Sequence, residues 1–282
     1  PKCGSSSPQK DTMRPYSGRF AELYDIFYED KPYDAEAKFV DSCLRAYSIG
    51  DTHRILELAC GTGQHAFRLE KLGYEIVATD YSEDMLRHAK RKAALLSSKV
   101  DFRLHDMRNI DLPDDPFDAV ICLFDSIGYV LTNQALIETL KGVHRHLRPN
   151  GLFVFEFWHA SAMLRSFEPL RIGRWSTSEG EVLRVSKTSL RYAEQIAIVD
   201  YDIFELRDSG IYAVYRETHA NRYFLLQEMA GWLAAAGFSP LKWFCGYAND
   251  ESITEHTWHI LAVARRNAHC SLGSTQVDVL PM

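Results

Sequence analysis

The chain has 282 residues, of which 46% are hydrophobic and 25% are charged, and its net charge is −6. These values are typical of one large globular domain, or of a domain with a sizeable insertion. Proteins that bind nucleic acid usually carry a basic face. No basic cluster stands out here, so we expect no nucleic-acid partner. No segment reaches the ~18 apolar residues of a membrane span, so we expect no membrane partner, and the first residues lack the apolar core of a signal peptide.

Six cysteines are spread along the chain, and no two have the spacing of a metal-binding pair. Two of them, Cys60 and Cys122, fall in segments predicted to be buried strands, where a reduced thiol behaves as a small apolar residue. We therefore expect reduced thiols, a cytoplasmic protein and no bound metal. The six are Cys3, Cys43, Cys60, Cys122, Cys245 and Cys270.

The first part of the chain predicts a flexible N-terminus over residues 1–18, rich in Ser, Pro, Gly and Lys, followed by two helices. Apolar residues at helical spacing predict one helix around Phe20–Phe27 and a second from about Asp34. Tyrosines crowd the junction between these helices. They form either an aromatic core or a lid over a pocket, and they are Tyr24, Tyr28 and Tyr33.

The segment RILELACGTGQH, at residues 54–65, predicts a buried strand, a glycine turn and the start of a helix. Gly61 and Gly63 tolerate unusual backbone angles and let a ligand lie against bare backbone. Backbone amides at the start of the following helix would face that ligand. A Gly-x-Gly turn alone is weak evidence, so the context decides between a ligand site and an ordinary tight turn.

Acidic residues follow the next three predicted strands, which lie at residues 75–80, 100–105 and 117–124. Asp80 ends the second strand 17 residues after Gly63, about where a carboxylate meets a ribose in nucleotide-binding folds. Asp106 and Asp125 follow the third and fourth strands. A helix at 133–147 and a fifth strand at 152–158 complete a parallel doubly wound α/β pattern. Ligands bind such sheets at the carboxyl ends of the strands.

Residues 171–222 lack helical periodicity and predict an antiparallel meander of three strands, at residues 180–192, 194–206 and 210–223. The α/β pattern then resumes with a helix at 224–236 and two strands at 239–247 and 257–265. The predicted organisation has four parts. They are a flexible N-terminus (1–18), a ligand-binding domain (19–158 and 223–266), an antiparallel β insertion (159–222) and a flexible tail (267–282).

Five motifs follow one another along the chain, namely LELACGTGQH (56–65), VATDYS (77–82), LHDMR (104–108), FDAVICLF (117–124) and LRPNGLFVFE (147–156). In this order they resemble the class I S-adenosylmethionine-dependent methyltransferases. The resemblance implies a Rossmann-like seven-stranded sheet of order 3-2-1-4-5-7-6 with the last strand antiparallel, an N-terminal helical lid, and S-adenosyl-L-methionine as the methyl donor, which becomes S-adenosyl-L-homocysteine.

The resemblance also implies roles for individual residues in binding the methyl donor. Glu57 would orient the glycine turn or meet the methionine ammonium, and Leu123 would offer a carbonyl to the same ammonium. The methionine moiety would pass over the backbone of Ala59, Gly61 and Gly63, and Asp80 would accept the ribose hydroxyls. The adenine ring would lie between Tyr81 and Met85, with its edge bound by Asp106 and Met107. Further contacts would come from Tyr24, Tyr33 and His65.

A dehydrogenase with the same kind of sheet fits the sequence less well. The turn is Gly61-Thr62-Gly63, not the G-x-G-x-x-G that brings a pyrophosphate onto a helix start. Position 66 is Ala, where the third glycine of that motif would fall.

Four further segments are similar to bacterial dTDP-aminosugar N,N-dimethyltransferases of the desosamine and mycaminose type, and glycine and sarcosine N-methyltransferases share part of this similarity. The chain departs from the sugar enzymes at Asp125, where they tend to have Ser, and at 156–159, where they usually have a Glu-Pro-Trp-Trp-like run. The segments are YDIFYEDKPYDAEA (24–37), HDMRNIDL (105–112), ICLFDSIGYV (121–130) and LRVSKTSLR (183–191).

An amine attacks the sulfonium methyl directly, so the protein mainly has to orient it and favour its neutral form. The catalytic candidates are Asp125, Tyr24 and Tyr129. His159 and His219 are expected to be structural or surface residues. Four residues are expected to bind the acceptor, namely Tyr28, Trp158, Arg184 and Ser186. Arginine suits a phosphate, whereas a solvent-exposed strand face is the alternative for Arg184 and Ser186.

The sequence thus predicts a methyltransferase for a small-molecule amine, with a nucleotide-linked aminosugar as one acceptor. A small amine, an amino acid or a phenolic natural product, methylated on N or O, is the alternative. Methylation of nucleic acid or protein fits less well, because the chain lacks the Asn/Asp-Pro-Pro-Tyr/Phe motif of amino-DNA methylases. A non-catalytic protein that binds the donor is a further alternative, and a homodimer is compatible with the sequence.

Overall fold

The computed structural model describes residues 15–207, 210–250 and 252–268. Most of the predicted flexible N-terminus and tail therefore lies outside the described residues. Within these ranges, no helix is long and apolar enough to cross a membrane.

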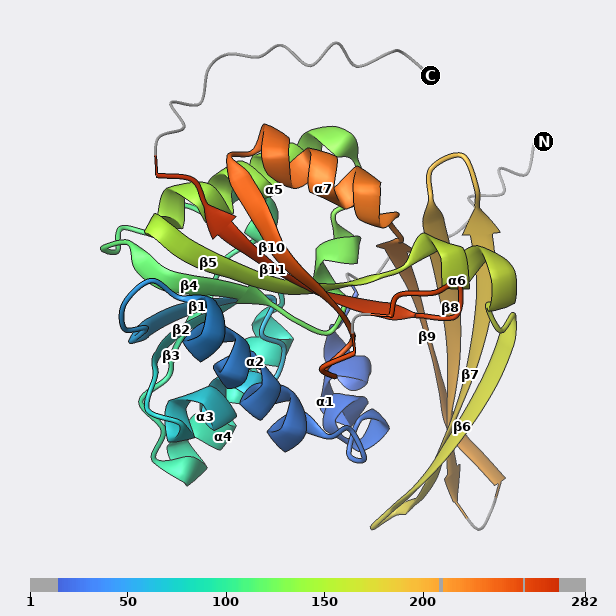
Figure 1. Cartoon of the computed structure of the whole chain (residues 1–282). Coiled ribbons are helices and arrows are strands. Elements are labelled where there is room, and N and C mark those ends of the chain that lie inside the picture. Colours follow the sequence, from blue (N-terminus) through green and yellow to red (C-terminus); the bar gives the residue numbers. More distant parts are fainter. Residues whose placement is uncertain (1–14, 208–209, 251, 269–282) are drawn as a thin grey trace, which may run out of the picture.

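A seven-stranded sheet forms the centre of the molecule (Figure 1), in the order β10-β11-β5-β4-β1-β2-β3. The strands β1 to β5 pair in parallel, and β11 is antiparallel to both of its neighbours. Numbered within this sheet alone, the order is 3-2-1-4-5-7-6, which confirms the predicted topology. The strands are β1 (Arg54–Leu58), β2 (Glu75–Asp80), β3 (Asp101–Leu104), β4 (Phe117–Cys122), β5 (Leu147–Trp158), β10 (Phe238–Cys245) and β11 (His259–Arg266).

The fifth strand is longer than predicted. It begins at Leu147, which pairs with Phe117, and the pairing resumes at Leu152 after a shift in register. Pro149 and Gly151 therefore lie inside an irregular strand instead of in a loop, because the preceding helix already ends at His146.

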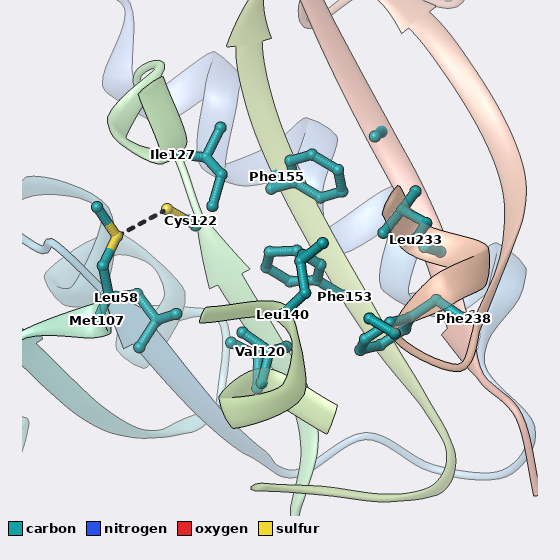
Figure 2. Packing of buried hydrophobic residues seen from close by; sticks show 14 of the residues in the cluster. Leu58, Met107, Val120, Cys122, Ile127, Leu140, Phe153, Phe155, Leu233 and Phe238 are labelled. Carbon is teal, nitrogen blue, oxygen red and sulfur yellow. Dashed lines mark hydrogen bonds between the residues drawn. The ribbon is translucent and has the colours of Figure 1, made fainter. Parts of the chain in front are cut away.

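Helices cover both faces of this sheet (Figure 1). Apolar residues of α2, α3 and α4 pack with one face, and those of α5 and α7 pack with the other. On the second face, Leu140 of α5 and Leu233 of α7 lie over the rings of Phe153 and Phe155 (Figure 2). The helices are α2 (Tyr33–Tyr47), α3 (Gln64–Lys71), α4 (Glu83–Leu96), α5 (Asn133–His146) and α7 (Leu226–Ala235).

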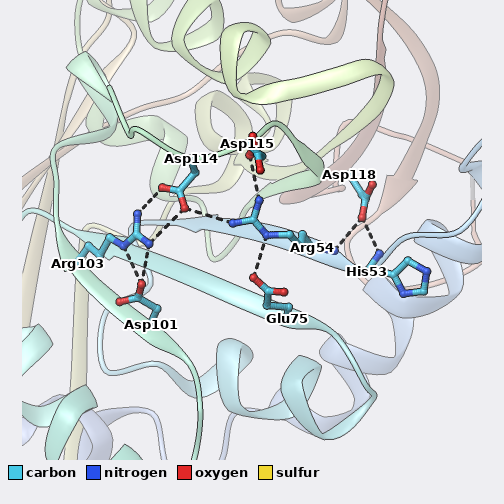
Figure 3. A network of polar contacts seen from close by, with 8 residues as sticks. All are labelled: His53, Arg54, Glu75, Asp101, Arg103, Asp114, Asp115 and Asp118. Carbon is cyan, nitrogen blue, oxygen red and sulfur yellow. Dashed lines mark hydrogen bonds and ion pairs between the residues drawn. The ribbon is translucent and has the colours of Figure 1, made fainter.

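The amino ends of the first strands are held by charged groups (Figure 3). Arg54 at the start of β1 bonds to Glu75 at the start of β2 and to Asp114, which also pairs with Arg103 of β3. Asp118 of β4 accepts hydrogen bonds from two backbone amides, those of His53 and Arg54. This network ties the amino ends of the strands together, at the edge of the sheet opposite to Asp80, Asp106 and Asp125.

The chain between β5 and β10 forms a second, antiparallel sheet of order β6-β7-β8-β9, preceded by the short helix α6 (Ala160–Ser166). The sequence predicted three of these strands but missed β6. The reason is that β6 is an edge strand in which no residue is fully buried, so it lacks the apolar signal of a core strand. The strands are β6 (Leu170–Thr177), β7 (Gly180–Arg191), β8 (Ile196–Arg207) and β9 (Gly210–Arg222).

Helix α1 (Gly18–Phe27) lies between the two sheets (Figure 1). Phe20 and Phe27 of this helix form one apolar cluster with Val182 of β7 and Ile203 of β8. Because α1 joins the inner face of the second sheet to the main domain, it closes one side of the space above the strand ends.

Candidate functional site

A cavity of about 810 Å³ opens at the carboxyl ends of β1, β2, β3 and β4. Its volume lies in the range of ordinary small-molecule sites. One part of its wall comes from the main sheet and includes Gly61, Asp80 and Asp106. The other part comes from α1, the loop after β4 and the strands β8 and β9, and includes Tyr24 and Tyr201.

The glycine turn after β1 has the backbone form that its sequence requires. Gly61 and Gly63 have φ angles of +55° and +82°, in the left-handed region that favours glycine. A methyl group on Gly63 would also come within 2.8 Å of the Phe102 ring. The turn therefore presents bare backbone to the cavity at Gly61.

Asp80 ties this turn to the start of α4. One carboxylate oxygen accepts the Gly61 amide at 2.8 Å, and the other accepts the Ser82 amide at 2.8 Å. Burial raises the pKa of Asp80 to about 6, and the backbone hydrogen bonds oppose that rise. The carboxylate is thus oriented by two amides at the wall of the cavity, as expected for a ribose ligand.

The residues expected around an adenine ring also line the cavity, namely Tyr81, Met85, Asp106 and Met107. Asp106 caps the short helix η1 (Met107–Asn109) by accepting the Arg108 amide, and its carboxylate also pairs with the Arg108 side chain. This pairing lowers the pKa of Asp106 against the effect of burial, so it is ionised and can accept a hydrogen bond.

Glu57 is buried behind the turn, and its Oε2 atom makes no hydrogen bond within the described residues. Burial, followed by the charge of Asp80, raises the pKa of Glu57 to about 8. A cationic ligand group would reverse that rise. The orphaned oxygen has the chemistry to accept an ammonium, such as the methionine end of the donor, although Glu57 is not among the described residues that line the cavity.

Five residues expected to bind the donor are not among the described residues that line the cavity, namely Tyr33, Glu57, Gly63, His65 and Leu123. His65 lies behind the glycine turn, where its Nε2 atom is 2.7 Å from Glu36 and its ring is 5.1 Å from that of Tyr33. The structure thus places His65 and Tyr33 as supports of the turn.

The loop after β4 reaches the cavity through a strained backbone. Phe124 and Asp125 have φ angles of +55° and +54°, which costs of order 1–3 kcal/mol per residue. The short helix η2 (Ser126–Tyr129) follows. Such strain is typical of functional sites, and here it brings the backbone of Asp125 to the cavity wall.

The carboxylate of Asp125 belongs to a charged cluster of two buried acids and His259, whose side chain is 43% exposed. His259 donates from Nδ1 to Asp125 at 2.9 Å and lies 3.3 Å from Glu156, whose other oxygen accepts the amide of Phe124 and the hydroxyl of Tyr247. The charge of Asp125 raises the pKa of His259 to about 11. The ligand atoms of the cluster lie within 4.8 Å of one another, which suits a small cation, but the imidazolium already supplies a positive charge there.

Replacing His259 with Gln should make the unfolding free energy less dependent on pH. The pKa of His259 is raised in the folded state from about 6.5 to about 11, so its stabilising contribution is complete below pH 6.5 and is lost as the pH rises toward 11. Urea unfolding should therefore show the largest difference between wild type and variant near pH 6.5 and a smaller one near pH 10. The exposed His256 provides a control, and a difference that stays constant with pH would contradict the ion pair.

Phenol groups line the cavity, among them those of Tyr16, Tyr24, Tyr28 and Tyr129. We call the part of the wall formed by residues 15–28, the loop after β4, β8 and β9 the acceptor side, because the sequence predicts that the acceptor binds there. The hydroxyls of Tyr16 and Tyr129 are hydrogen-bonded to each other. Burial raises the pKa of Tyr16, Tyr24 and Tyr129 well above the ordinary value. These hydroxyls therefore stay protonated at neutral pH and can orient a ligand by hydrogen bonding.

The sequence did not identify Tyr16 as a site residue, because it lies in the segment predicted to be flexible. The backbone carbonyls of Pro15 and Tyr16 accept hydrogen bonds from the hydroxyls of Tyr81 and Ser82, at 2.8 and 2.6 Å. Gly18 donates its amide to Asp84 at 2.5 Å. Residues 15–18 thus form a strap over the turn that follows β2.

His219 was expected to be structural or on the surface, and this expectation was incomplete. It is buried in the wall of the cavity, together with Asn221 of the same strand. The signal in the sequence was the alternation Glu217-x-His219-x-Asn221, which places three polar side chains on one face of β9. His159, in contrast, contacts the backbone of Thr257 and does not line the cavity.

Arg184 does not lie on a solvent-exposed face, so that alternative was wrong. Its guanidinium carbon is 4.6 Å from the ring centroid of Phe27, 5.5 Å from that of Tyr28, 5.0 Å from that of Trp175 and 5.3 Å from that of Tyr201. Its Nε and Nη1 atoms are buried and make no hydrogen bond within the part of the chain that the structure describes. Ser186, two residues further along β7, is buried, and Trp158 lines the cavity.

Comparisons with known proteins agree with this geometry. The family model described as "Methyltransferase domain" matches residues 55–151. The protein named "Putative methyltransferase YqeM" of Bacillus subtilis is 32% identical over 79% of this chain and 86% of its own length. The dTDP-3-amino-3,6-dideoxy-alpha-D-glucopyranose N,N-dimethyltransferase of Streptomyces fradiae is 31% identical over 83% of this chain and 88% of its own length.

Solved structures share the fold. An S-adenosylmethionine-dependent methyltransferase from Clostridium acetobutylicum superposes with a TM-score of 0.75 at 22% identity, over 88% of this chain and 98% of its own. DesVI of Streptomyces venezuelae superposes with a TM-score of 0.72 at 24% identity, over 88% of this chain and 99% of its own. The sheet order, the glycine turn with Asp80 and these relatives together show that the chain belongs to the class I S-adenosylmethionine-dependent methyltransferases.

Proposed function

We propose that the protein transfers a methyl group to an amine of a small molecule, and that this amine is carried by a nucleotide-linked sugar. The observation that supports an amine best is the acceptor side of the cavity, which combines several tyrosine rings with buried acids. Aromatic faces and carboxylates both attract a cationic ammonium. The acids on this side are Asp125, which lines the cavity, and Glu217, which is buried and hydrogen-bonded to the cavity residue His219.

The residues that would hold the donor are those whose geometry fits its groups. Asp80 would accept the ribose hydroxyls, Asp106 the adenine amino group, and Glu57 the methionine ammonium, while Gly61 would offer bare backbone. When bound, S-adenosylmethionine supplies a methyl group on a positively charged sulfur, which a neutral amine can attack. The chain's own part is to bind both reactants, exclude water and favour the neutral amine.

Arg184 supports a phosphate on the acceptor. Among the described residues, two of its nitrogen atoms are buried and find no hydrogen-bond partner, and buried unpaired donors are costly unless a ligand satisfies them. Arg184 itself is not among the described residues that line the cavity, but its guanidinium lies against the rings of Tyr28 and Tyr201, which are. The named aminosugar enzymes among the relatives act on dTDP-linked sugars, as their names state, and a dTDP group carries phosphates.

Replacing Arg184 with Gln should raise KM for dTDP-3-amino-3,6-dideoxyglucose by about tenfold or more, because a charge-assisted hydrogen bond to phosphate contributes about 1.5–3 kcal/mol. KM for the free aminosugar without dTDP should change little. Lys187, also on β7 but with a 60% exposed side chain, offers the matched control Lys187→Gln. Steady-state rates of S-adenosylhomocysteine release give these values, and equal changes for both acceptors would contradict the phosphate contact.

A panel of acceptors tests the proposed function itself. The panel contains dTDP-aminosugars, free aminosugars, glycine, small alkylamines and phenols, and each is incubated with the donor. We expect the protein to methylate amines and to prefer the dTDP-aminosugars. A preference for glycine or a phenol would show that the acceptor is an amino acid or a phenolic compound instead of a nucleotide-linked sugar. If the protein binds the donor tightly but methylates none of the amines, the proposal that it is an amine methyltransferase is wrong.

A further inference from the structure

Glu217 and His219 form a buried pair on the inner face of β9. The Nε2 atom of His219 lies 2.7 Å from a carboxylate oxygen of Glu217, and each side chain is only 4% exposed. Because a carboxylate accepts a hydrogen bond, the imidazole carries its proton on Nε2. The lone pair is therefore on Nδ1, which is directed toward the hydroxyl of Tyr129 at 3.5 Å.

Aromatic rings and a carboxylate surround the ring of His219. Three aromatic rings pack against it, with centroids 4.5 Å away for Tyr16 and 5.0 Å away for Phe20 and Tyr201. Aromatic faces attract cations, and the Glu217 carboxylate lies at hydrogen-bonding distance from the ring. The titratable groups facing His219 are thus Glu217 of its own strand, Tyr201 of β8, Tyr129 of η2 and Tyr16 of the strap.

The other candidates on the acceptor side are poorly suited to take a proton. The hydroxyls of Tyr16, Tyr24 and Tyr129 remain protonated, since burial raises their pKa. The carboxylate of Asp125 is already bound by the imidazolium of His259. The imidazole of His219 is the remaining group, because it lines the cavity and its Nδ1 atom faces the Tyr129 hydroxyl instead of a charged partner.

We propose that His219, held by Glu217, is the general base that removes a proton from the acceptor ammonium before methyl transfer. This role rests on the proposed function. An N–H bond of the ammonium breaks, its electron pair stays on nitrogen, and the proton passes to Nδ1, directly or through the Tyr129 hydroxyl. The nitrogen lone pair then forms the N–C bond as the C–S bond breaks with its pair going to sulfur, and His219 releases its proton to solvent.

The variant His219→Asn tests this proposal through its pH profile. At pH 7 its kcat/KM for dTDP-3-amino-3,6-dideoxyglucose should fall by about 10²–10⁴-fold, the usual contribution of a general base. The loss should shrink as the pH rises toward ~10, where an alkylammonium deprotonates in solution. Glu217→Gln should show a smaller loss with the same trend. His256→Asn, at an exposed site, should behave as wild type.

A second readout is independent of activity. Nitrogen chemical shifts of histidine in the donor-free protein, assigned by the signal missing from His219→Asn, should show His219 with its proton on Nε2. A proton on Nδ1 would overturn the proposal, and so would a loss of activity in His219→Asn that is equal at every pH, or no loss at all. Failure of the wild type to methylate any amine would instead refute the proposed function, and the base role with it.

Discussion

Replacing Asp80 with alanine should weaken binding of S-adenosylmethionine by about 100-fold. The carboxylate has two tasks, because it accepts amides from the glycine turn and from the start of α4 while it faces the cavity. The variant loses the ligand's charge-assisted hydrogen bonds, each worth about 1.5–3 kcal/mol, and it also frees the Gly61 amide. A factor of ten in affinity corresponds to ~1.4 kcal/mol, so the expected loss of about 3 kcal/mol is readily measured.

Isothermal titration calorimetry of the purified protein measures this affinity directly. Glu83 is exposed at the first turn of α4, three residues away, so Glu83→Ala is a control for charge loss in the same region. The control should bind the donor as the wild type does. An Asp80→Ala variant that folds normally and keeps the wild-type affinity would remove Asp80 from the donor site.

Replacing Gly128 with alanine should damage the acceptor side more than the donor side. A methyl group at this position would lie 1.9 Å from Oδ1 of Asn221 and 2.8 Å from the carbonyl oxygen of Arg222. Asn221 would be displaced from its hydrogen bond to the carbonyl of Asp125, and the backbone of β9 would have to move away from η2. Overpacking of this kind costs about 1–3 kcal/mol.

Two measurements together identify this effect. Urea unfolding should show a loss of about 1–3 kcal/mol for Gly128→Ala, and acceptor KM should rise severalfold while donor affinity changes little. Gly231 lies in helix α7, and no heavy atom of the described residues comes within 4 Å of an added methyl, so Gly231→Ala should be stabilising by about 0.5–1 kcal/mol. Wild-type stability and acceptor KM in Gly128→Ala would show that η2 and β9 do not form one wall.

The donor half of the site could be predicted from the sequence because it depends on local signals. The strand, glycine turn and helix at 54–71 are contiguous, and Asp80 and Asp106 each follow a strand of the same parallel sheet. In such a sheet the carboxyl ends meet at one edge. The order of the strands followed from the family resemblance.

The acceptor half could not be predicted in the same way, because distant segments build it. His219 pairs with Glu217 along β9 but reaches the cavity only because β9 packs against η2. His259 meets Asp125 through the antiparallel pairing of β11 with β5. Tyr16 contacts Tyr129 across the cavity wall from a segment whose composition indicated flexibility. Local sequence patterns do not encode such long-range contacts. The alternation of polar residues in β9 did indicate that Glu217, His219 and Asn221 share one face of the strand.

The central claim is that this cavity methylates the nitrogen of an amine. The most direct measurement incubates the wild-type protein with S-adenosylmethionine carrying a trideuterated methyl group and with dTDP-3-amino-3,6-dideoxyglucose, and locates the label in the product by NMR and mass spectrometry. The account predicts a trideuteromethyl group on the sugar nitrogen. A label on oxygen, or none on any amine although the donor is bound, would contradict it.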